Sequence, residues 1–250
     1  MNDYRRETSR LLASGQPIDP AARRDDAHLL AIGHEACRLL TEAGIPSMVG
    51  GGVAVWSYGR RRYTKDVDLF IPPRIPLLAL DALGRHGFHT RETDASWLYK
   101  AIKQDVLVDI IVWTTGNIRV NDETFERARS AQIDGYSFTL MGPEDVLFRK
   151  ILSHKEERRD WYDALSMMTR PLAGFDWEYF LKLVGVPYAR RTLSFLFYAQ
   201  TEIRPEVVPP AVLAELLGRL PNPHDEASLG PILMMPTERI TPPHAGESLP

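Results

Sequence analysis

After a polar lead-in that runs to about Ala21, the chain carries apolar residues spaced three and four positions apart. This spacing places Leu29, Ile32 and Ala36 on one face and predicts an amphipathic helix from about residue 25 to residue 43. A glycine and a proline follow directly and end the helix. The first predicted element is therefore a helix with one buried face.

Two later segments have the patterns of β-strands. In DVDLFI, the alternation places Asp66 and Asp68 on one face and the apolar residues Val67 and Leu69 on the other. The run VLVDIIVW, from residue 106 to residue 113, is apolar on both faces except for Asp109, which is typical of a central buried strand. Acidic side chains thus interrupt two strands of the predicted core.

The remaining elements before Gly142 alternate between strand and helix. They are a strand at Met48–Val49, a helix at about Val53–Tyr58, a helix at about Ile75–His86 and a strand at Tyr136–Leu140. Strands mixed with two or three helices predict an α/β or α+β fold, in which helices cover a small mixed sheet.

After Gly142 the patterns are those of helices alone. They are expected at about Pro143–Lys155, Arg158–Thr169, Asp176–Leu183, Ala189–Gln200 and Ala211–Leu217. We therefore predict a mixed-sheet core over residues 22–141 and a C-terminal helical bundle over residues 142–220. Residues 221–250 are rich in proline and polar residues and are predicted to form a disordered tail.

Composition narrows the class of protein only slightly. The 250 residues are 44% hydrophobic and 25% charged, as in ordinary globular proteins. The formal net charge of -3 gives no overall attraction to nucleic acid, so an RNA partner would need a local basic site. A single cysteine, Cys37, excludes an intrachain disulfide. With a polar N-terminus and no apolar run of about 20 residues, we expect a cytoplasmic protein without a membrane partner.

The window from Met48 to Pro72 carries most of the functional information. A short strand leads into three glycines, a helix follows, and a strand then bears Asp66 and Asp68. Glycines before a helix allow a phosphate to approach the backbone and the free N–H groups of the first turn. Two carboxylates two residues apart on a strand project in parallel and can hold a hard divalent cation.

Each part of this window alone also fits a simpler interpretation. An isolated Asp-x-Asp pair is usually solvated, and three glycines are often only a flexible turn. The window lacks the Lys-Ser/Thr pair of a Walker loop and the last glycine of a dinucleotide fingerprint. A glycosyltransferase Asp-x-Asp motif would leave the glycines unexplained.

Asp109 provides independent support for a metal site. An unpaired carboxylate inside an apolar strand would cost several kcal/mol. A cation shared with Asp66 and Asp68 would compensate it, and an ion pair with an arginine is the alternative. A cationic cluster precedes the two acids and fits either a solubilising loop or a site for triphosphate or RNA; it consists of Arg60, Arg61, Arg62 and Lys65.

Taken together, the window resembles the polymerase-beta-like nucleotidyltransferase superfamily, in which a hydrophobic residue and two small residues precede an acid-x-acid strand. Within it, the segment GGVAVWSYGRRRYTKDVDLFI is most similar to the AbiEii/MenT branch, the nucleotidyltransferase toxins of type IV toxin-antitoxin systems. That pattern coincides here with Gly51, Gly52, Ala54, Gly59, Arg62, Thr64, Asp66 and Asp68. The resemblance extends more loosely through Asp109 to about Leu165.

The resemblance implies roles for individual residues. Asp66, Asp68 and Asp109 would be the catalytic and metal-binding triad, with Asp109 acting on the acceptor hydroxyl. The nucleotide-binding residues would be Gly51, Gly52, Arg62, Thr64, Lys150 and Asp160. Asp160 and Asp163 lie one helical turn apart and could equally be a solvated helix face or pair with neighbouring arginines. Lys150 is predicted at the edge of the buried face of its helix.

The resulting expectation is an enzyme that uses Mg2+, with two ions expected, and an NTP substrate. It would move a nucleoside monophosphate to a hydroxyl on a tRNA end or a protein, and an antitoxin protein would be a partner of a toxin. The alternatives are a small-molecule adenylyltransferase of the antibiotic-resistance type and a catalytically silent nucleotide-binding protein.

Overall fold

The computed structural model of the protein describes residues 26–154, 160–169 and 174–220. The predicted lead-in and proline-rich tail lie outside these ranges. The helices of the sheet-containing part are α2 (Asp26–Glu42), α3 (Gly51–Tyr58), α4 (Pro76–Gly84) and α5 (Asp122–Glu126). The helices that follow are α6 (Pro143–Ser153), α7 (Asp160–Met168), α8 (Trp177–Val184), α9 (Ala189–Glu202), the 3-10 helix η2 (Pro205–Val207) and α10 (Pro210–Gly218).

The strands form one large sheet and one small hairpin. They are β1 (Met48–Val49), β2 (Asp66–Phe70), β3 (His89–Asp94), β4 (Leu98–Lys103), β5 (Val106–Ile111), β6 (Trp113–Thr114), β7 (Ile118–Arg119), β8 (Arg129–Ile133) and β9 (Tyr136–Leu140). The large sheet has seven strands in the order β3-β4-β5-β2-β1-β9-β8. It is mixed, because β2 is parallel to β5 and antiparallel to β1. The predicted mixed α/β fold class is confirmed.

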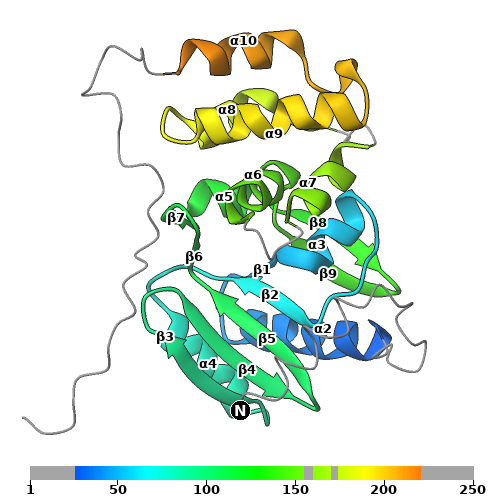
Figure 1. Cartoon of the computed structure of the whole chain (residues 1–250). Helices are drawn as coiled ribbons and strands as arrows, with labels where there is room; N and C mark the ends of the chain where they lie inside the picture. The colour runs from blue at the N-terminus through cyan, green and yellow to red at the C-terminus, as the bar shows by residue number, and fades with distance from the viewer. Residues whose placement is uncertain (1–25, 155–159, 170–173, 221–250) are drawn as a thin grey trace, which may run out of the picture.

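The two faces of the large sheet have different coverings. Helices α2 and α4 pack on one face, as Figure 1 shows, and there Val67, Leu69, Val108 and Ile110 enter the first hydrophobic cluster. The opposite face carries the acidic residues of β2 and β5. The alternation read in DVDLFI therefore corresponds to a buried face and an acidic face.

The helices after residue 142 pack onto the sheet-containing part. Helix α6 contacts α3, α7, α8 and α9, and α5, α6 and α7 lie between the sheet and the outer helices α8, α9 and α10 (Figure 1). The second hydrophobic cluster joins Met48 and Phe70 from the strands to Leu147 and Phe195 from the helices. The helical part thus shares a core with the strands, and the domain boundary near residue 141 stays a prediction.

Some predicted elements have different bounds in the structure. The helix predicted from Val53 begins at Gly51, so two glycines form its first turn. The strand predicted to reach Trp113 ends at Ile111, because Trp113 pairs with Arg119 in the separate β6–β7 hairpin. The helix predicted at about residues 158–169 is described from Asp160 onward. Its predecessor, predicted to reach about Lys155, ends at Ser153, because the backbone at His154 is already extended. Across the described ranges, no helix is both long and apolar enough to cross a membrane.

Candidate active site

Three carboxylates project from the face of the sheet opposite α2 and α4, which we call the open face. Strands β2 and β5 are parallel neighbours, and their register sets Asp68 directly opposite Asp109. Because side chains alternate along a strand, Asp66 shares this face with both. Burial raises the pKa of Asp109, and the negative charge of Asp66 raises it further, although the adjacent Lys100 lowers it. The structure therefore brings the three predicted acids together on one face.

Two glycines at the start of α3 lie directly against this face. Gly51 has a φ of +54°, and a Cβ built on it would overlap the carboxylate of Asp68. A Cβ on Gly52 would lie 2.5 Å from Thr64 Oγ1. Only glycine fits both positions without displacing a site residue. The first turn of α3, whose N–H groups have no intrahelical acceptor, consequently starts beside Asp68.

Asp109 has an ion-pair partner in the structure. Lys100 lies opposite Asp109 on the antiparallel strand β4, and its Nζ donates to Asp109 Oδ1 at 2.7 Å. The alternative considered for Asp109, an ion pair, therefore applies, but the partner is a lysine and not an arginine. The carboxylate has hydrogen-bonding compensation without any bound ion.

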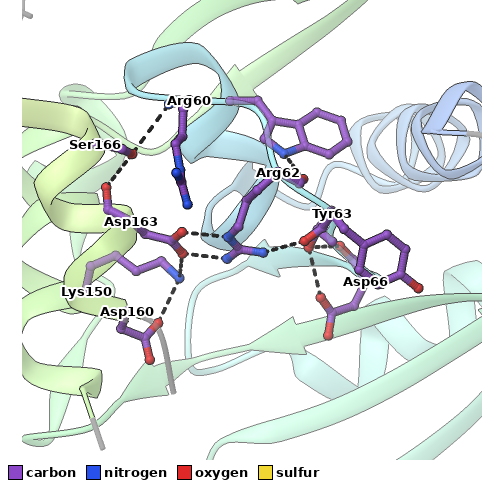
Figure 2. Close-up of polar contacts among 10 residues, drawn as sticks. Arg60, Arg62, Tyr63, Asp66, Lys150, Asp160, Asp163 and Ser166 are labelled. Atoms are coloured by element: carbon purple, nitrogen blue, oxygen red, sulfur yellow. Dashed lines mark hydrogen bonds and ion pairs between the residues drawn. The ribbon is translucent and has the colours of Figure 1, made fainter. Parts of the chain in front are cut away.

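A second polar cluster links this region to α6 and α7 (Figure 2). Arg62 donates to Asp163 through Nε at 2.6 Å and Nη2 at 2.5 Å, and to the carbonyl of Tyr63 through Nη1 at 2.7 Å. Lys150 Nζ lies 2.9 Å from Asp160 Oδ1 and 2.9 Å from Asp163 Oδ2. We call Arg62, Lys150, Asp160 and Asp163 the four-charge cluster. It joins the loop before β2 to two helices of the C-terminal part.

Burial and pairing set the protonation of the four-charge cluster. Burial lowers the pKa of Lys150, but the charges of Asp160 and Asp163 outweigh it, so the pKa is raised overall. Burial raises the pKa of Asp163, yet hydrogen bonds and charge from Arg62 and Lys150 hold it below its usual range. Arg62, Lys150 and Asp163 are therefore charged near neutral pH.

Lys150 differs in position from the sequence expectation. It was expected at the edge of the buried face of its helix, but α6 is buried on nearly all sides and Lys150 is only 8% exposed. The cause is tertiary, because α3, α7, α8 and α9 surround α6. Asp160 and Asp163 are likewise buried and do not form a solvated helix face.

The other arginines of the cationic cluster are also engaged. Arg61 pairs with Asp134 at 2.6 Å and with Asp26 at 3.1 Å. The guanidinium of Arg60 stacks on Tyr162, with its Cζ 3.6 Å from the ring centroid. The loop before β2 therefore uses much of its positive charge to bind α2, α7 and the β8–β9 turn.

The oxygen donors on the open face fit a divalent cation. Asp66, Asp68 and Asp109 supply the hard oxygen ligands that Mg2+ prefers, and the absence of a side chain at Gly51 leaves the Asp68 carboxylate room. In the conformation of the described residues, however, no group of three His, Cys, Asp or Glu side chains is arranged to hold a metal ion. Lys100 donates to Oδ1 of Asp109, so a bound cation would share this carboxylate with an ammonium.

Lys100 is the residue of this region that sequence reasoning missed. The feature that places Lys100 opposite Asp109 is the two-residue turn between β4 and β5, where Gln104 and Asp105 have φ values of 48° and 62°. Such a turn fixes the register of a hairpin, and here it pairs Lys103 with Val106 and Lys100 with Asp109. The turn lacks the Asn-Gly or Asp-Gly sequence that usually reveals this geometry.

Comparison with solved structures gives similarities at low sequence identity. An antigenic nucleotidyltransferase-like protein from Paracoccidioides brasiliensis is 16% identical, with a TM-score of 0.46, and the match covers 78% of this chain and 94% of that one. The solution structure of the antibiotic-resistance factor ANT(2'')-Ia is 17% identical, with a TM-score of 0.43, and the match again covers 78% and 94% of the two chains. The lincosamide antibiotic adenylyltransferase LnuA, in its lincomycin-bound form, is 12% identical, with a TM-score of 0.40, over 53% of this chain and 92% of that one. No curated protein sequence matches the chain.

Sequence comparison with protein families is more decisive. Residues 30–182 match the family described as "Nucleotidyl transferase of unknown function (DUF2204)". The match covers more than half of the chain and includes the glycines of α3, the three acids of the open face and the four-charge cluster. The chain therefore belongs to this family of nucleotidyl transferases.

Proposed function

We propose that the protein transfers a nucleoside monophosphate from an NTP to an acceptor hydroxyl, in a Mg2+-dependent reaction that releases pyrophosphate. The observation that carries the proposal is the register of β2 and β5, which aligns Asp68 with Asp109 beside the glycines of α3. Carboxylates for a cation and free N–H groups for phosphate are then side by side. Phosphoryl-type transfer needs mainly such positioning and electrostatic stabilisation.

In this proposal the three acids divide the chemistry. Mg2+ held by Asp66, Asp68 and Asp109, as one or two ions, would neutralise the charge that develops on the phosphates. Asp109 also accepts or orients the proton of the acceptor hydroxyl, a contribution of about 10² to 10⁴-fold for a general base. The hydroxyl oxygen forms a bond to the α-phosphorus as the bond to pyrophosphate breaks.

The glycines and the loop before β2 would bind the nucleotide. The N–H groups that start α3 at Gly51 and Gly52 suit phosphate oxygens. Thr64 and Arg62 are assigned to the same task because both lie against Gly52, where an added Cβ would be 2.5 Å from Thr64 Oγ1 and 3.5 Å from Arg62 Nη1.

The C-terminal helices would act on the nucleotide indirectly. Lys150 and Asp160, which the family resemblance assigns to the nucleotide, are buried behind Arg62 and in contact with it through Asp163. We therefore assign them the role of fixing Asp163, which in turn orients Arg62. Their effect on nucleotide affinity would be a consequence of the position of the guanidinium.

The acceptor is proposed from the resemblance to the AbiEii/MenT branch, which implies a hydroxyl on a tRNA end or a protein, and an antitoxin as partner. A tRNA acceptor would have to bind at a local basic surface, because the net charge of the chain is -3. Arg61 and Arg62 already pair with acids, which reduces the positive charge that the loop before β2 offers to RNA. A small-molecule acceptor is the alternative outcome of the same assay.

The test is transfer of label from each of four α-32P NTPs to bulk tRNA, to a protein extract and to aminoglycoside or lincosamide acceptors, with Mg2+ or with EDTA. We expect Mg2+-dependent labelling of one acceptor class and none with the Asp66→Asn, Asp68→Asn double variant. Calorimetry should detect NTP binding to the parent protein and not to the double variant. Unchanged NTP affinity in that variant would contradict the assignment of these carboxylates, and NTP binding by the parent without labelling of any acceptor would favour the silent nucleotide-binding protein.

A further inference from the structure

Lys100 places a positive charge on the sheet face that carries the three acids. It lies opposite Asp109 in the β4–β5 pair, with 2.7 Å between Nζ and Oδ1. The two side chains are 21% and 13% exposed, so both are mostly withdrawn from water. An ammonium in this position stands next to the place where a divalent cation would bind.

The same strand offers a lysine in a different setting. Lys103 pairs with Glu35 at 2.8 Å and is also 21% exposed, but it is three residues away and so on the opposite face. Its partner Glu35 belongs to α2, which covers the other side of the sheet. Lys103 has therefore the same residue type, strand and degree of exposure as Lys100, without contact with the acids of the site.

Carboxylates that share one face repel each other, and a nearby positive charge relieves that repulsion. Asp66, Asp68 and Asp109 lie on one face of the neighbouring strands β2 and β5, with Asp68 opposite Asp109. Lys100 is a positive charge on the chain itself, and it lies beside Asp109. A divalent cation competes for the same carboxylate and is repelled by the ammonium.

We propose that Lys100 is a positioning residue, a tethered counter-ion that holds the Asp109 carboxylate until a divalent cation takes its place. The inference rests on the proposed function, because it assumes that Asp109 becomes a metal ligand. It adds a specific exchange of partners, from Lys100 to the metal, and thereby makes Lys100 a determinant of metal affinity.

The experiment compares the full-length parent with Lys100→Met, Lys100→Arg and the control Lys103→Met. Titration with Mn2+ alone, followed by electron paramagnetic resonance, should give a dissociation constant about tenfold lower for Lys100→Met, since a repelling charge is removed. Lys100→Arg and Lys103→Met should bind Mn2+ like the parent. Lys100→Gln, which can still donate a hydrogen bond, serves as a second neutral variant if Lys100→Met does not fold.

Thermal unfolding provides a readout that does not depend on activity. In EDTA, Lys100→Met should melt below the parent, and at saturating Mg2+ this difference should disappear, because the metal then compensates Asp109. The deficit of Lys103→Met should be the same in both conditions. A lysine with a purely structural role would also give a deficit independent of Mg2+.

The outcomes separate this inference from the proposed function. If the parent binds Mn2+ but both neutral variants at Lys100 bind it no more tightly, the counter-ion role is wrong and the proposed function stands. If the parent binds neither Mn2+ nor NTP with Mg2+, both fall. Tighter Mn2+ binding together with the Mg2+-dependent recovery of stability supports the exchange.

Discussion

Replacing Lys150 by methionine should destabilise the whole protein. Lys150 lies in α6 with a side chain that is 10% exposed, and its Nζ is 2.9 Å from both Asp160 and Asp163. Methionine has a similar length, so the variant Lys150→Met loses the charge and its hydrogen bonds but little packing volume. Two buried carboxylates then lose a shared cation at the same time.

The structure sets the size of the effect. Removing one partner of a buried ion pair costs about 3 to 5 kcal/mol. Arg62 retains its two hydrogen bonds to Asp163, which favours the lower end, about 3 kcal/mol. For a protein of this size, about 2 to 4 °C of Tm is lost per kcal/mol, so the expected decrease is about 6 to 12 °C.

Urea and thermal unfolding at pH 7, followed by circular dichroism, measure the change in free energy. Lys182→Met is the matched control, because Lys182 also pairs with a carboxylate, Glu123, at 2.7 Å but is 66% exposed. Exposed pairs contribute about 0 to 1 kcal/mol. Equal losses in the two variants would refute the argument that burial gives the four-charge cluster its energetic importance.

Three further changes test other parts of the site. Gly51→Ala should lower the free energy of unfolding clearly more than Gly44→Ala, because both glycines have positive φ but only at Gly51 would the Cβ overlap Asp68. The control Gly44→Ala should lose about 1 to 2 kcal/mol from backbone strain. Similar losses in the two variants would show that the site tolerates the methyl group. Asp109→Asn should keep NTP affinity within a few-fold by calorimetry and lower the rate of transfer by about 10² to 10⁴-fold, and transfer at the parental rate would remove Asp109 from the mechanism. Asp163 has a depressed pKa in the folded state, so its stabilising contribution is present above its unfolded pKa of about 3.9 and is lost as the pH falls through its folded value. The free energy of unfolding of Asp163→Asn should therefore depend less on pH below about 4 than that of the parent. The same pH dependence in both proteins would argue against the pairing.

The acidic face of the sheet could be predicted because it depends on a local rule. In a strand, alternate residues share a face, so the sequence from Asp66 to Ile71 already separates acidic from apolar positions. The apolar run around Asp109 similarly predicts an interior strand, and β5 is the third strand of the seven-stranded order. The helices after Gly142 could be predicted from the spacing of apolar residues and from the prolines and glycines at helix ends, which are also local features of the sequence.

Elements without an apolar pattern could not be predicted in this way. The sequence of β3, HTRETD, is exposed at every position and lies at the edge of the sheet. Such a strand is held by backbone hydrogen bonds to β4 and buries no alternating side chains, so its sequence has no hydrophobic periodicity that would predict a strand. Without β3 and β4, the partner of Asp109 could not be identified as Lys100.

The burial of α6 shows a second limit. Its sequence, PEDVLFRKILS, contains four charged residues, which would normally indicate an exposed face. The structure buries all four, and they find partners on distant elements. Arg149 donates to the carbonyl oxygens of Ile118 and Arg119 in strand β7, and Asp145 accepts from Tyr179. Polar residues paired over such separations can be recognised only once the fold is known.

The charges of the site lead to a last prediction, that NTP binds essentially only as its Mg2+ complex. The three acids Asp66, Asp68 and Asp109, with Lys100 and Lys65 near Asp109, and the four-charge cluster together comprise five carboxylates and four cations. Their formal sum is negative, so an NTP polyanion would approach a surface of its own sign. The N–H groups of α3 carry only about half a positive charge, which leaves about half of this negative charge uncompensated. In calorimetric titrations, the affinity for NTP in EDTA should therefore be at least about 100-fold lower than in Mg2+, an amount that corresponds to about 2.7 kcal/mol. Equal affinity in the two buffers would mean that Arg62 and Lys150 leave their carboxylates to bind the phosphates directly.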